Sequence, residues 1–366
     1  MKQPRQKIAF VGDTLGEGGA ERVQARLSFY FEAQDIEVHH IIVRDVVTYE
    51  YAGTLFNMGL LKDTKNGFSN KYKRLSVFRS YLKEHEFDYI IDFRVKNKTL
   101  QEFLIAKWVY TTKYIMSIRS FNTLYYFPKN TFLARNIYKN AYGIVTVSKA
   151  LEARIKTEYG YQNVETIYNP LLLEQVSEDS KAFVPFDFLY ILGIGRMQND
   201  IKQFDHLIEA YDASIAKENG IKLVLIGDGK FKQGLERLVA EKDITDNVVF
   251  VSHQTNPFPY FKNALVTALT SRNEGFPNVL IESLACETPV VAYNCESGPS
   301  EIIENESNGL LVKNQDISAM ASALSRMISD TALYQKCKAQ ARPSVERFNF
   351  ETIGKAWLDF LKIDEK

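Results

Sequence analysis

The sequence lacks the features that assign a chain to several common classes of site. It holds only three cysteines in 366 residues, Cys286, Cys295 and Cys337, and an odd number without metal-type spacing predicts neither a disulfide framework nor a zinc site. Such a chain suits a reducing compartment. Asp-x-Asp, His-Glu-x-x-His and Gly-x-Ser-x-Gly sequences are also missing. We therefore expect no metal–diphosphate site of the Asp-x-Asp kind, no zinc-protease helix and no serine-hydrolase elbow.

A long apolar run is missing as well. After the basic residues 1–7, the apolar segment is only Ile8 to Val11, which is too short for a signal peptide or a membrane span. The five histidines are scattered and predict no ligand cluster. We therefore expect a cytoplasmic protein without a metal site.

The net charge is zero, but the charge is unevenly distributed. Residues 1–170 hold 25 Lys and Arg against 17 Asp and Glu, and residues 71–149 hold 15 against 5. Residues 71–149 are also rich in aromatic side chains. A basic, aromatic surface suits an anionic membrane or a phosphate-bearing lipid, so we expect peripheral attachment to the cytoplasmic face of the inner membrane. Ordinary surface cations over an aromatic core would give the same pattern. A nucleic-acid partner is not expected, because no recognised nucleic-acid motif is present.

Short apolar segments alternate with helical periodicity along both halves of the chain. In the first half, strands are predicted at 7–12, 36–43, 88–93, 113–118 and 143–147, with helices at 20–33, 72–86, 100–110 and 149–158 between and after them. Residues 171–187 have no clear period and read as a linker. The pattern then repeats, with strands at 188–193, 222–226, 248–251, 264–270 and 289–293. Helices are predicted at 204–216, 230–242, 317–329, 331–341 and about 350–362. Such alternation predicts parallel sheets.

The prediction is therefore an α/β protein with two Rossmann-like domains facing each other. We place the first domain at residues 1–170, the second at 171–348 and a terminal amphipathic helix within 349–366.

The stretch from Glu274 to Glu282 is the first candidate for chemistry. It follows the predicted strand 264–270, and Pro277 suits the first position of a helix. Glu274 would lie in a loop at the carboxyl edge of the sheet, where parallel α/β proteins bind ligands. The helix start offers free N–H groups to a phosphate. Two glutamates eight residues apart are also common on solvated helices, so the pair alone is not decisive.

Two further loops follow predicted strands. Residues 16–21, Gly-Glu-Gly-Gly-Ala-Glu, would let a backbone approach a phosphate, but the third glycine of the dinucleotide fingerprint is replaced by Glu21. Arg196 and Lys202 follow the strand at 188–193, and two cations at a sheet edge can clamp a diphosphate and stabilise it as a leaving group. A plain strand-to-helix turn and an ordinary basic loop are the alternative interpretations.

Together these segments resemble the large retaining glycosyltransferase family of the GT-B fold, known as glycosyltransferase family four or group 1. The resemblance covers nearly the whole chain in the family's order. The segments that carry it are 18–23, 148–150, 169–170, 195–196 with Lys202, 227–229, 274–282, 288–292, 298–301 and 308–312.

The resemblance implies roles for individual residues. Arg196 and Lys202 would hold the diphosphate of a nucleotide sugar, Glu282 the ribose, and Glu274 the transferred sugar, so that Arg196, Lys202 and Glu274 are the catalytic candidates. The other donor-side candidates are Gly18, Gly19, Gly195, Gly227, His253, Gly275, Phe276, Pro277 and Asn278. His253 could touch the base or cap a helix. The acceptor-side candidates are Glu21, Arg119 and Ser120.

The resemblance also implies the chemistry. Such enzymes need no metal cofactor, because the basic pair and helix ends neutralise the leaving diphosphate. The configuration of the sugar would be retained by front-side attack, with the leaving phosphate accepting the acceptor's proton. The expected donor is a UDP-sugar carrying a hexose or N-acetylhexosamine, and the expected acceptor is a glycan or lipid-linked glycan in surface polysaccharide synthesis.

Three positions depart from the family's pattern. Many relatives carry glycine where this chain has Gln203 and Glu287, and many carry an acceptor-side histidine in the region of Arg119-Ser120. The last departure resembles a branch that acts on polyprenyl-diphosphate-linked N-acetylhexosamines.

Two other classes remain open from the sequence. One is another nucleotide-sugar enzyme on the same two-domain frame, such as a UDP-sugar epimerase, or an NAD-linked oxidoreductase, although the incomplete glycine fingerprint does not favour NAD. The other is a protein that binds a nucleotide sugar without turning it over. The complete set of Arg196, Lys202, Glu274 and Glu282 favours the transferase.

Overall fold

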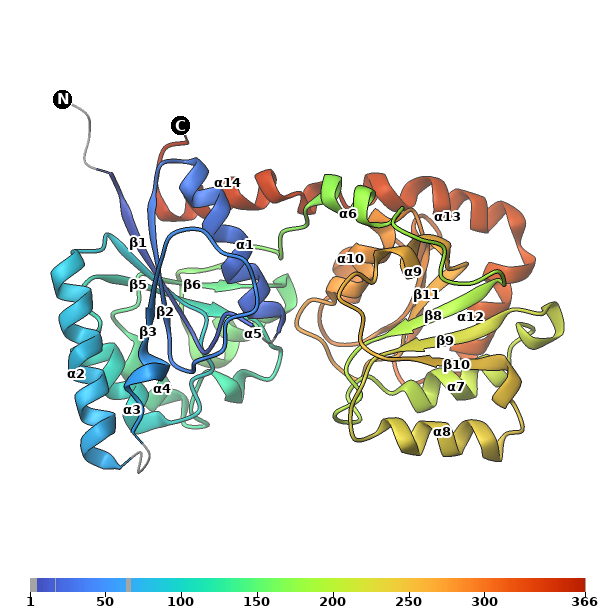
Figure 1. The fold of residues 1–366 in the computed structure, drawn as a ribbon, viewed down its shortest axis with the longest axis horizontal. Coiled ribbons are helices and arrows are strands. Elements are labelled where there is room, and N and C mark those ends of the chain that lie inside the picture. The colour runs from blue at the N-terminus through green and yellow to red at the C-terminus, as the bar shows by residue number, and fades with distance from the viewer. Residues whose placement is uncertain (1–4, 17, 64–66, 366) are drawn as a thin grey trace. The chain divides into compact units, whose positions relative to one another are not determined.

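The computed structural model describes residues 5–16, 18–63 and 67–365, and it divides the chain into two α/β units (Figure 1). Unit 1 comprises residues 1–170 and 350–366, and unit 2 comprises residues 171–349. Both units are built on a parallel sheet, which confirms the predicted fold class. No helix among the described residues is both long and apolar enough to traverse a bilayer.

Unit 1 contains a seven-stranded parallel sheet with the strand order β3-β2-β1-β4-β5-β6-β7. Its strands are β1 Lys7–Gly12, β2 Glu37–Ile42, β3 Thr54–Asn57, β4 Tyr89–Asp92, β5 Lys113–Ile118, β6 Gly143–Thr146 and β7 Val164–Thr166. The central strands are almost entirely apolar and buried because helices cover both faces of the sheet.

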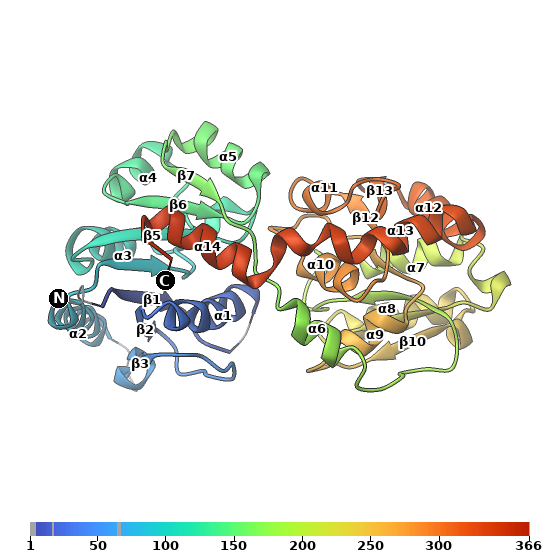
Figure 2. The same ribbon diagram turned by 90° about the horizontal axis from the view of Figure 1, so that it is seen from above.

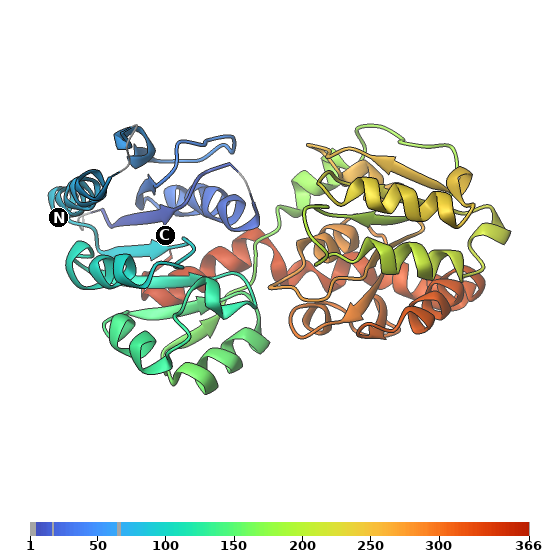
Figure 3. The same ribbon diagram turned by 90° about the horizontal axis from the view of Figure 1, so that it is seen from below.

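The two faces of this sheet carry different helices. One face is covered by α1 (Gly19–Ala33) and α14 (Phe350–Leu361), which pack together (Figure 2). The opposite face carries α2 (Phe68–His85), α3 (Thr99–Leu104) with the π-helical turn η2 (Ile105–Val109), α4 (Thr131–Tyr138) and α5 (Lys149–Tyr159) (Figure 3). Two 3-10 turns, η1 (Met58–Leu61) and η3 (Thr123–Tyr125), lie in the connections.

The last helix belongs to unit 1 because its apolar face completes that core. Trp357 is fully buried with Phe10 and Phe31 in one hydrophobic cluster, and the Tyr89 hydroxyl donates a hydrogen bond to the Leu361 carbonyl at 2.5 Å. Gly354 lies against the Tyr30 ring, where a Cβ atom would come within 2.5 Å of the ring carbons. The predicted helix at 350–362 is confirmed, and a side chain at position 354 would force α1 and α14 apart.

Unit 2 contains a six-stranded parallel sheet with the order β10-β9-β8-β11-β12-β13. The strands are β8 Tyr190–Ile194, β9 Lys222–Ile226, β10 Val248–Val251, β11 Val266–Leu269, β12 Val290–Asn294 and β13 Gly309–Lys313. The helices are α6 Leu173–Asp179, α7 Phe204–Asp212, α8 Lys232–Glu241, α9 Phe258–Asn263, α10 Asn278–Ala285, α11 Pro299–Ile302, α12 Ile317–Ser329 and α13 Thr331–Ser344. In Figure 1, α7 and α8 lie on one face of this sheet and α10 on the other.

Several local predictions were wrong. The presumed linker 171–187 contains α6, whose Leu173 and Val176 are buried, and the sequence reading missed β3, α4 and α9. Pro277 is the residue before α10 rather than its first residue, since the helix begins at Asn278. Lys202 does not start a helix, because α7 begins at Phe204. These short elements carry too few apolar positions for a periodic signal, so their packing decides them.

Candidate functional site

The order of the strands in unit 2 defines a natural ligand edge. Strand β8 lies between β9 on one side and β11 on the other. The strands after β8 are therefore added first on one side of it and then, from β11 onward, on the other side, although all of them are parallel. Open parallel sheets bind ligands outside the carboxyl ends of their strands at such a switch point. The loops that begin at Gly195 after β8 and at Thr270 after β11 lie at this edge, and they contain Arg196, Lys202 and Glu274.

Glycines allow the loops after β8 and β9 to touch. Gly227 has φ +148°, and a Cβ atom there would lie 2.0 Å from the Gly195 carbonyl oxygen. Gly195 in turn borders the Lys202 side chain, because its Cβ would lie 3.1 Å from the Lys202 Cε atom. The backbone amide of Met197 donates to the Asp228 carbonyl at 2.9 Å. Three of the predicted positions, Gly195, Lys202 and Gly227, therefore form one packed group.

An ion pair joins two of the predicted catalytic residues. The Lys202 Nζ atom lies 2.6 Å from the Glu274 Oε1 atom, and the two side chains are only 22% and 13% exposed. The Thr270 hydroxyl bonds to the carbonyls of Lys202 at 3.1 Å and Gln203 at 2.8 Å, which ties the loop after β8 to the end of β11. The sequence predicted both residues at this edge, but it did not predict that they contact each other.

The Gly275-Phe276-Pro277 turn is held by the loop after β12. The Ser297 hydroxyl donates to the Gly275 carbonyl at 2.8 Å. Gly298 has φ +96°, and a Cβ atom there would lie 2.4 Å from the Pro277 Cδ atom. The buried Phe276 ring packs edge-on against Phe348, with 5.3 Å between the ring centroids. This turn therefore presents the start of α10 in one fixed position, and Pro277, the residue before the helix, supplies no side-chain cap.

The other donor-side candidates lie around this group. Glu282 is in the middle of α10 and only 5% exposed, whereas Arg196 is exposed at the end of β8. Asn278 is the first residue of α10. His253 is exposed after β10, and its backbone amide donates to Asp228 Oδ2 at 2.7 Å. His253 thus adjoins the loop that contains Gly227, while the structure gives it no contact with Lys202 or Glu274. No group of three or more His, Cys, Asp or Glu side chains placed to hold a metal ion occurs in the described part of the chain.

The first glycine-rich loop lies at the equivalent edge of unit 1. Gly18 is the residue before α1, Gly19 is its first residue, and Glu21 lies in its first turn. Glu17 of this motif lies outside the described residues. The loop follows β1, which lies between β2 and β4, so it too begins at a switch point between strands.

Arg119 follows β5 at the same edge and is bonded to Asn169, near the point where the chain leaves unit 1. Its Nη1 donates to the Asn169 side-chain oxygen and its Nε to the Ser117 hydroxyl at 2.9 Å, while Nη2 is buried without a hydrogen-bond partner. Burial lowers the pKa of Arg119 to about 10. The backbone amide of Arg119 also donates a hydrogen bond, at 3.1 Å, to the hydroxyl of Tyr126. Ser120 lies next to Arg119, where its hydroxyl accepts from the Asn122 amide at 3.3 Å.

Tyr126 links the acceptor-side candidates. Burial raises the pKa of its phenol to about 12, and among the smaller influences are Arg119, which lowers it, and the carboxylate of Glu21, which raises it. Tyr126 is therefore close enough to sense both Arg119 and Glu21, which come from different strand ends. The sequence reading missed Tyr126, since nothing in its local context distinguishes it from a core tyrosine.

The sequence reading also missed a buried cluster of charged side chains at the carboxyl end of β4. Arg94 bonds to Asp92 at 2.8 Å and to Glu102 at 3.1 Å, and Lys96 lies 3.4 Å from Asp92. Burial alone would raise the pKa of Asp92, but Arg94 and Lys96 outweigh it and lower that pKa to about 2. The alternating charges in Asp92-Phe93-Arg94-Val95-Lys96, directly after a buried strand, were the available signal.

The two positions at which the family resemblance leads us to expect glycine have a conformation that glycine favours. Gln203 has φ +46° and Glu287 has φ +63°, both in the left-handed region. Gln203 is held there by reciprocal side-chain bonds with Gln315, at 2.8 and 2.6 Å. Glu287 is held by Lys262 at 2.5 Å. The backbone at both positions therefore has a shape suited to glycine, although neither residue is glycine.

Comparison with known proteins shows similarity to glycosyltransferases in both sequence and fold. Residues 177–343 match the family model described as "Glycosyl transferases group 1". A Campylobacter jejuni N-acetylgalactosaminyltransferase, named for its acceptor N-acetylgalactosamine-N,N'-diacetylbacillosaminyl-diphospho-undecaprenol, is 29% identical over 97% of this chain and 99% of its own. A second transferase of that organism, an alpha-1,4-N-acetyl-D-galactosaminyltransferase, is 26% identical over 97% and 98%.

Solved structures agree on the fold. A glycosyltransferase from Rickettsia africae superposes with a TM-score of 0.79 at 17% identity over 98% of both chains. Anabaena HepE in complex with UDP superposes with a TM-score of 0.78 at 18% identity, over 98% of this chain and 100% of its own. These comparisons do not favour a UDP-sugar epimerase. Residues 177–343 thus match the glycosyl transferases group 1 family, and the chain as a whole has the GT-B fold of the solved glycosyltransferases.

Proposed function

We propose that the chain is a retaining glycosyltransferase that moves a hexose or N-acetylhexosamine from a UDP-sugar to a glycan or lipid-linked glycan during surface polysaccharide synthesis. The observation that carries the proposal is the Lys202–Glu274 pair at the switch point of unit 2, beside the fixed turn before α10. The names of the Campylobacter relatives, which specify diphospho-undecaprenol-linked acceptors, support the choice of acceptor.

The donor diphosphate would bind between Arg196, Lys202 and the first N–H groups of α10. A diphosphate carries at least two negative charges, and cations and a helix N-terminus stabilise it most as the glycosidic bond breaks. Arg196 is exposed and can reach a ligand. In this proposal no metal cofactor is required, because these groups neutralise the leaving diphosphate.

Lys202 and Glu274 would change partners when the donor binds. Without donor, the carboxylate of Glu274 satisfies Lys202 at 2.6 Å. A bound diphosphate offers Lys202 stronger acceptors, and Glu274 is then free to accept hydrogen bonds from hydroxyls of the sugar. Glu282, buried in α10, would accept hydrogen bonds from the ribose diol. The acceptor hydroxyl would attack from the face that the diphosphate leaves, which retains the configuration.

Binding at a membrane surface would follow from the acceptor. A lipid-linked glycan keeps its carrier in the bilayer, and the basic, aromatic character of residues 71–149 suits an anionic surface. We therefore propose peripheral attachment at the cytoplasmic face of the inner membrane. Sedimentation with vesicles of anionic and of neutral lipid would test it, and equal binding to both would contradict the electrostatic part.

The test of the function is a panel of UDP-sugars scored for release of UDP, which needs no acceptor. We expect hydrolysis of at least one N-acetylhexosamine or hexose donor, loss of turnover by orders of magnitude in Arg196→Ala, and weaker UDP binding in Glu282→Ala by calorimetry. NMR of the transferred sugar would report the anomeric configuration. Absence of both binding and turnover with every nucleotide sugar, beside a positive NAD titration, would overturn the proposal.

A further inference from the structure

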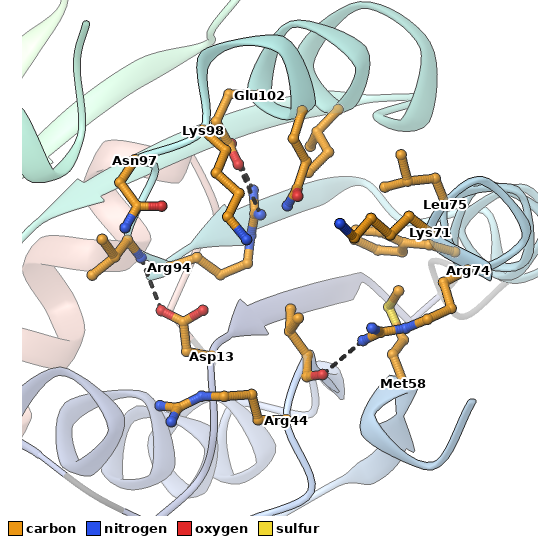
Figure 4. Close-up of a pocket in the computed structure, with 15 residues that line it drawn as sticks. Asp13, Arg44, Met58, Lys71, Arg74, Leu75, Arg94, Asn97, Lys98 and Glu102 are labelled. Carbon is orange, nitrogen blue, oxygen red and sulfur yellow. Dashed lines mark hydrogen bonds and ion pairs between the residues drawn. The ribbon is translucent and has the colours of Figure 1, made fainter. Parts of the chain in front are cut away.

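Unit 1 contains a pocket that the donor chemistry does not use. It has a volume of about 260 Å³ and opens at the carboxyl ends of β1, β2 and β4, where Asp13, Val43 and Arg94 follow the strands. Its other walls come from η1, from the first three turns of α2, and from α3 and the start of η2 (Figure 4). Because β1 lies between β2 and β4, the pocket occupies the switch point of this sheet, which is where open parallel sheets bind ligands.

The pocket is lined mainly by cations. Five of its lining residues are basic, Arg44, Lys71, Arg74, Arg94 and Lys98, and two are acidic, Asp13 and Glu102. In Figure 4 the Lys71 and Lys98 side chains extend toward each other, Arg74 lies to the lower right of them, and Arg44 lies below Asp13. These four cations come from three segments of the chain, because Lys71 and Arg74 both belong to α2, and only the folded unit brings them together.

The two acids are already engaged. Glu102 is neutralised by Arg94 at 3.1 Å, and Arg94 also pairs with Asp92. Asp13 accepts a hydrogen bond from the Val95 amide at 3.0 Å, which fixes the loop after β4. With Arg44 left aside, the lining still holds four cations against these two carboxylates.

Arg74 adds an observation that is independent of the charge count. Its Nη2 donates to the Val43 carbonyl at 2.8 Å, which holds the guanidinium at the end of β2. Its Nε atom is buried and has no hydrogen-bond partner. Because Nε is out of reach of solvent, an anion in the pocket would meet this guanidinium through its terminal nitrogens. The guanidinium is thus fixed in place with unused capacity to donate.

We propose that this pocket binds a diphosphate group. A cavity of this size is smaller than the roughly 300–1,000 Å³ of sites that enclose whole drug-sized ligands, and it suits a compact anion. Resting on the proposed function, we assign the group to the lipid-linked acceptor, so that unit 1 recognises the carrier's diphosphate while the glycan extends beyond the pocket.

Exposed apolar side chains on the same elements favour a lipid carrier over a free anion. Leu60 and Leu61 lie in η1, Tyr72 in α2, and Leu100 and Phe103 in α3, and they are 39–70% exposed. These are the three elements that carry Met58, Lys71 and Gln101 into the pocket wall. A prenyl chain attached to a diphosphate in the pocket would meet this apolar surface, whereas inorganic pyrophosphate would not.

The experiment measures binding of inorganic pyrophosphate to the full chain by calorimetry, with UDP added to occupy the donor site. The test variant is Lys71→Ala/Lys98→Ala, and the matched control is Lys73→Ala/Lys83→Ala, which removes two exposed lysines of α2 that do not line the pocket. We expect the Kd to rise about tenfold or more in the test variant and to stay nearly constant in the control. An equal change of Kd in both variants, or no change in either, would refute the proposed diphosphate site.

A second arm separates the two sources of the anion. Farnesyl diphosphate, titrated below its micellar concentration, should bind at least about tenfold more tightly than pyrophosphate, and Leu100→Ser should reduce this advantage without affecting pyrophosphate. Equal affinities would leave a diphosphate site but refute the lipid assignment. Neither titration depends on sugar transfer. If the parent protein hydrolyses a UDP-sugar but Lys71→Ala/Lys98→Ala binds pyrophosphate as the parent does, the pocket alone is refuted. If the parent hydrolyses no UDP-sugar but the variant binds pyrophosphate more weakly, the proposed function alone is refuted.

Discussion

Replacing Glu274 by glutamine should affect UDP binding and turnover in opposite directions. The substitution keeps the size of the side chain but removes the charge that holds Lys202 at 2.6 Å. Two charges about 4 Å apart attract by about 4 kcal/mol at an effective dielectric constant of about 20. Desolvation and side-chain ordering offset most of this, which leaves a net value of about 1 kcal/mol for a partly exposed pair.

That net value predicts the size of each effect. UDP competes with Glu274 for Lys202, so Glu274→Gln should bind UDP about fivefold more tightly, the ratio that corresponds to about 1 kcal/mol. Hydrolysis of the UDP-sugar should fall at least about a hundredfold, because the sugar loses a carboxylate acceptor. Unit 2 should lose about 1 kcal/mol of stability, a fall of about 2–4 °C in its unfolding midpoint.

Calorimetry with UDP and a UDP-release assay on the same preparations measure the two directions. Lys202→Met is the companion variant, and it should weaken UDP binding whether or not Glu274 is present. If Glu274→Gln weakened UDP binding as much as Lys202→Met does, Lys202 would not change partners and the reasoning would be wrong. Unchanged hydrolysis would refute the sugar contact separately.

Three further predictions concern stability. Burial lowers the pKa of His40 to about 4, below its unfolded value of about 6.5. Neutral His40 therefore contributes about 3 kcal/mol to the free energy of unfolding, and this contribution is complete above pH 6.5 and lost as the pH falls to 4. The free energy of unfolding of His40→Gln, measured with urea, should depend less on pH across that window. Glu287→Gly should keep or raise the thermal midpoint, because relief of the left-handed backbone, about 1 kcal/mol, compensates for the exposed Lys262 pair and for the greater freedom of glycine; a fall of several degrees would contradict this. Arg119→Lys should lower stability by about 1–3 kcal/mol by losing its bond to Asn169 and leave calorimetric UDP affinity unchanged, whereas weaker UDP binding would show that its effect extends beyond unit 1.

Prediction from the sequence succeeded where the signal was local and repeated. The strands at Lys7–Gly12, Lys113–Ile118 and Lys222–Ile226 and the helix at Ile317–Ser329 have the predicted bounds. Each is an apolar or periodic run ended by glycine or polar residues, which restricts both type and length. The prediction of a linker at 171–187, where the structure has helix α6, failed for the opposite reason, since seven residues with two buried apolar side chains do not establish a period.

The loops that follow strands were also within reach of the sequence. Parallel strands bring their carboxyl ends to one edge whatever their order, so Arg196, Lys202 and Glu274 were predicted at one edge without knowledge of neighbours. Their assigned roles rest on the family resemblance and remain predictions. The left-handed backbone at Gln203 was signalled only by the glycine that the family resemblance leads us to expect there, because no local rule places a glutamine at positive φ.

The sequence by itself determined the alternation of strands and helices, the parallel α/β class and the residues that end each strand, since these depend on neighbours within a few positions. Only the tertiary structure decided which strand ends adjoin. Lys202 meets Glu274 across 72 positions of sequence, and Arg119 meets Asn169 across 50. The basic pocket combines strand ends with α2 and α3. Strand order is set by how whole layers bury their apolar faces, and that choice leaves no trace in any short segment.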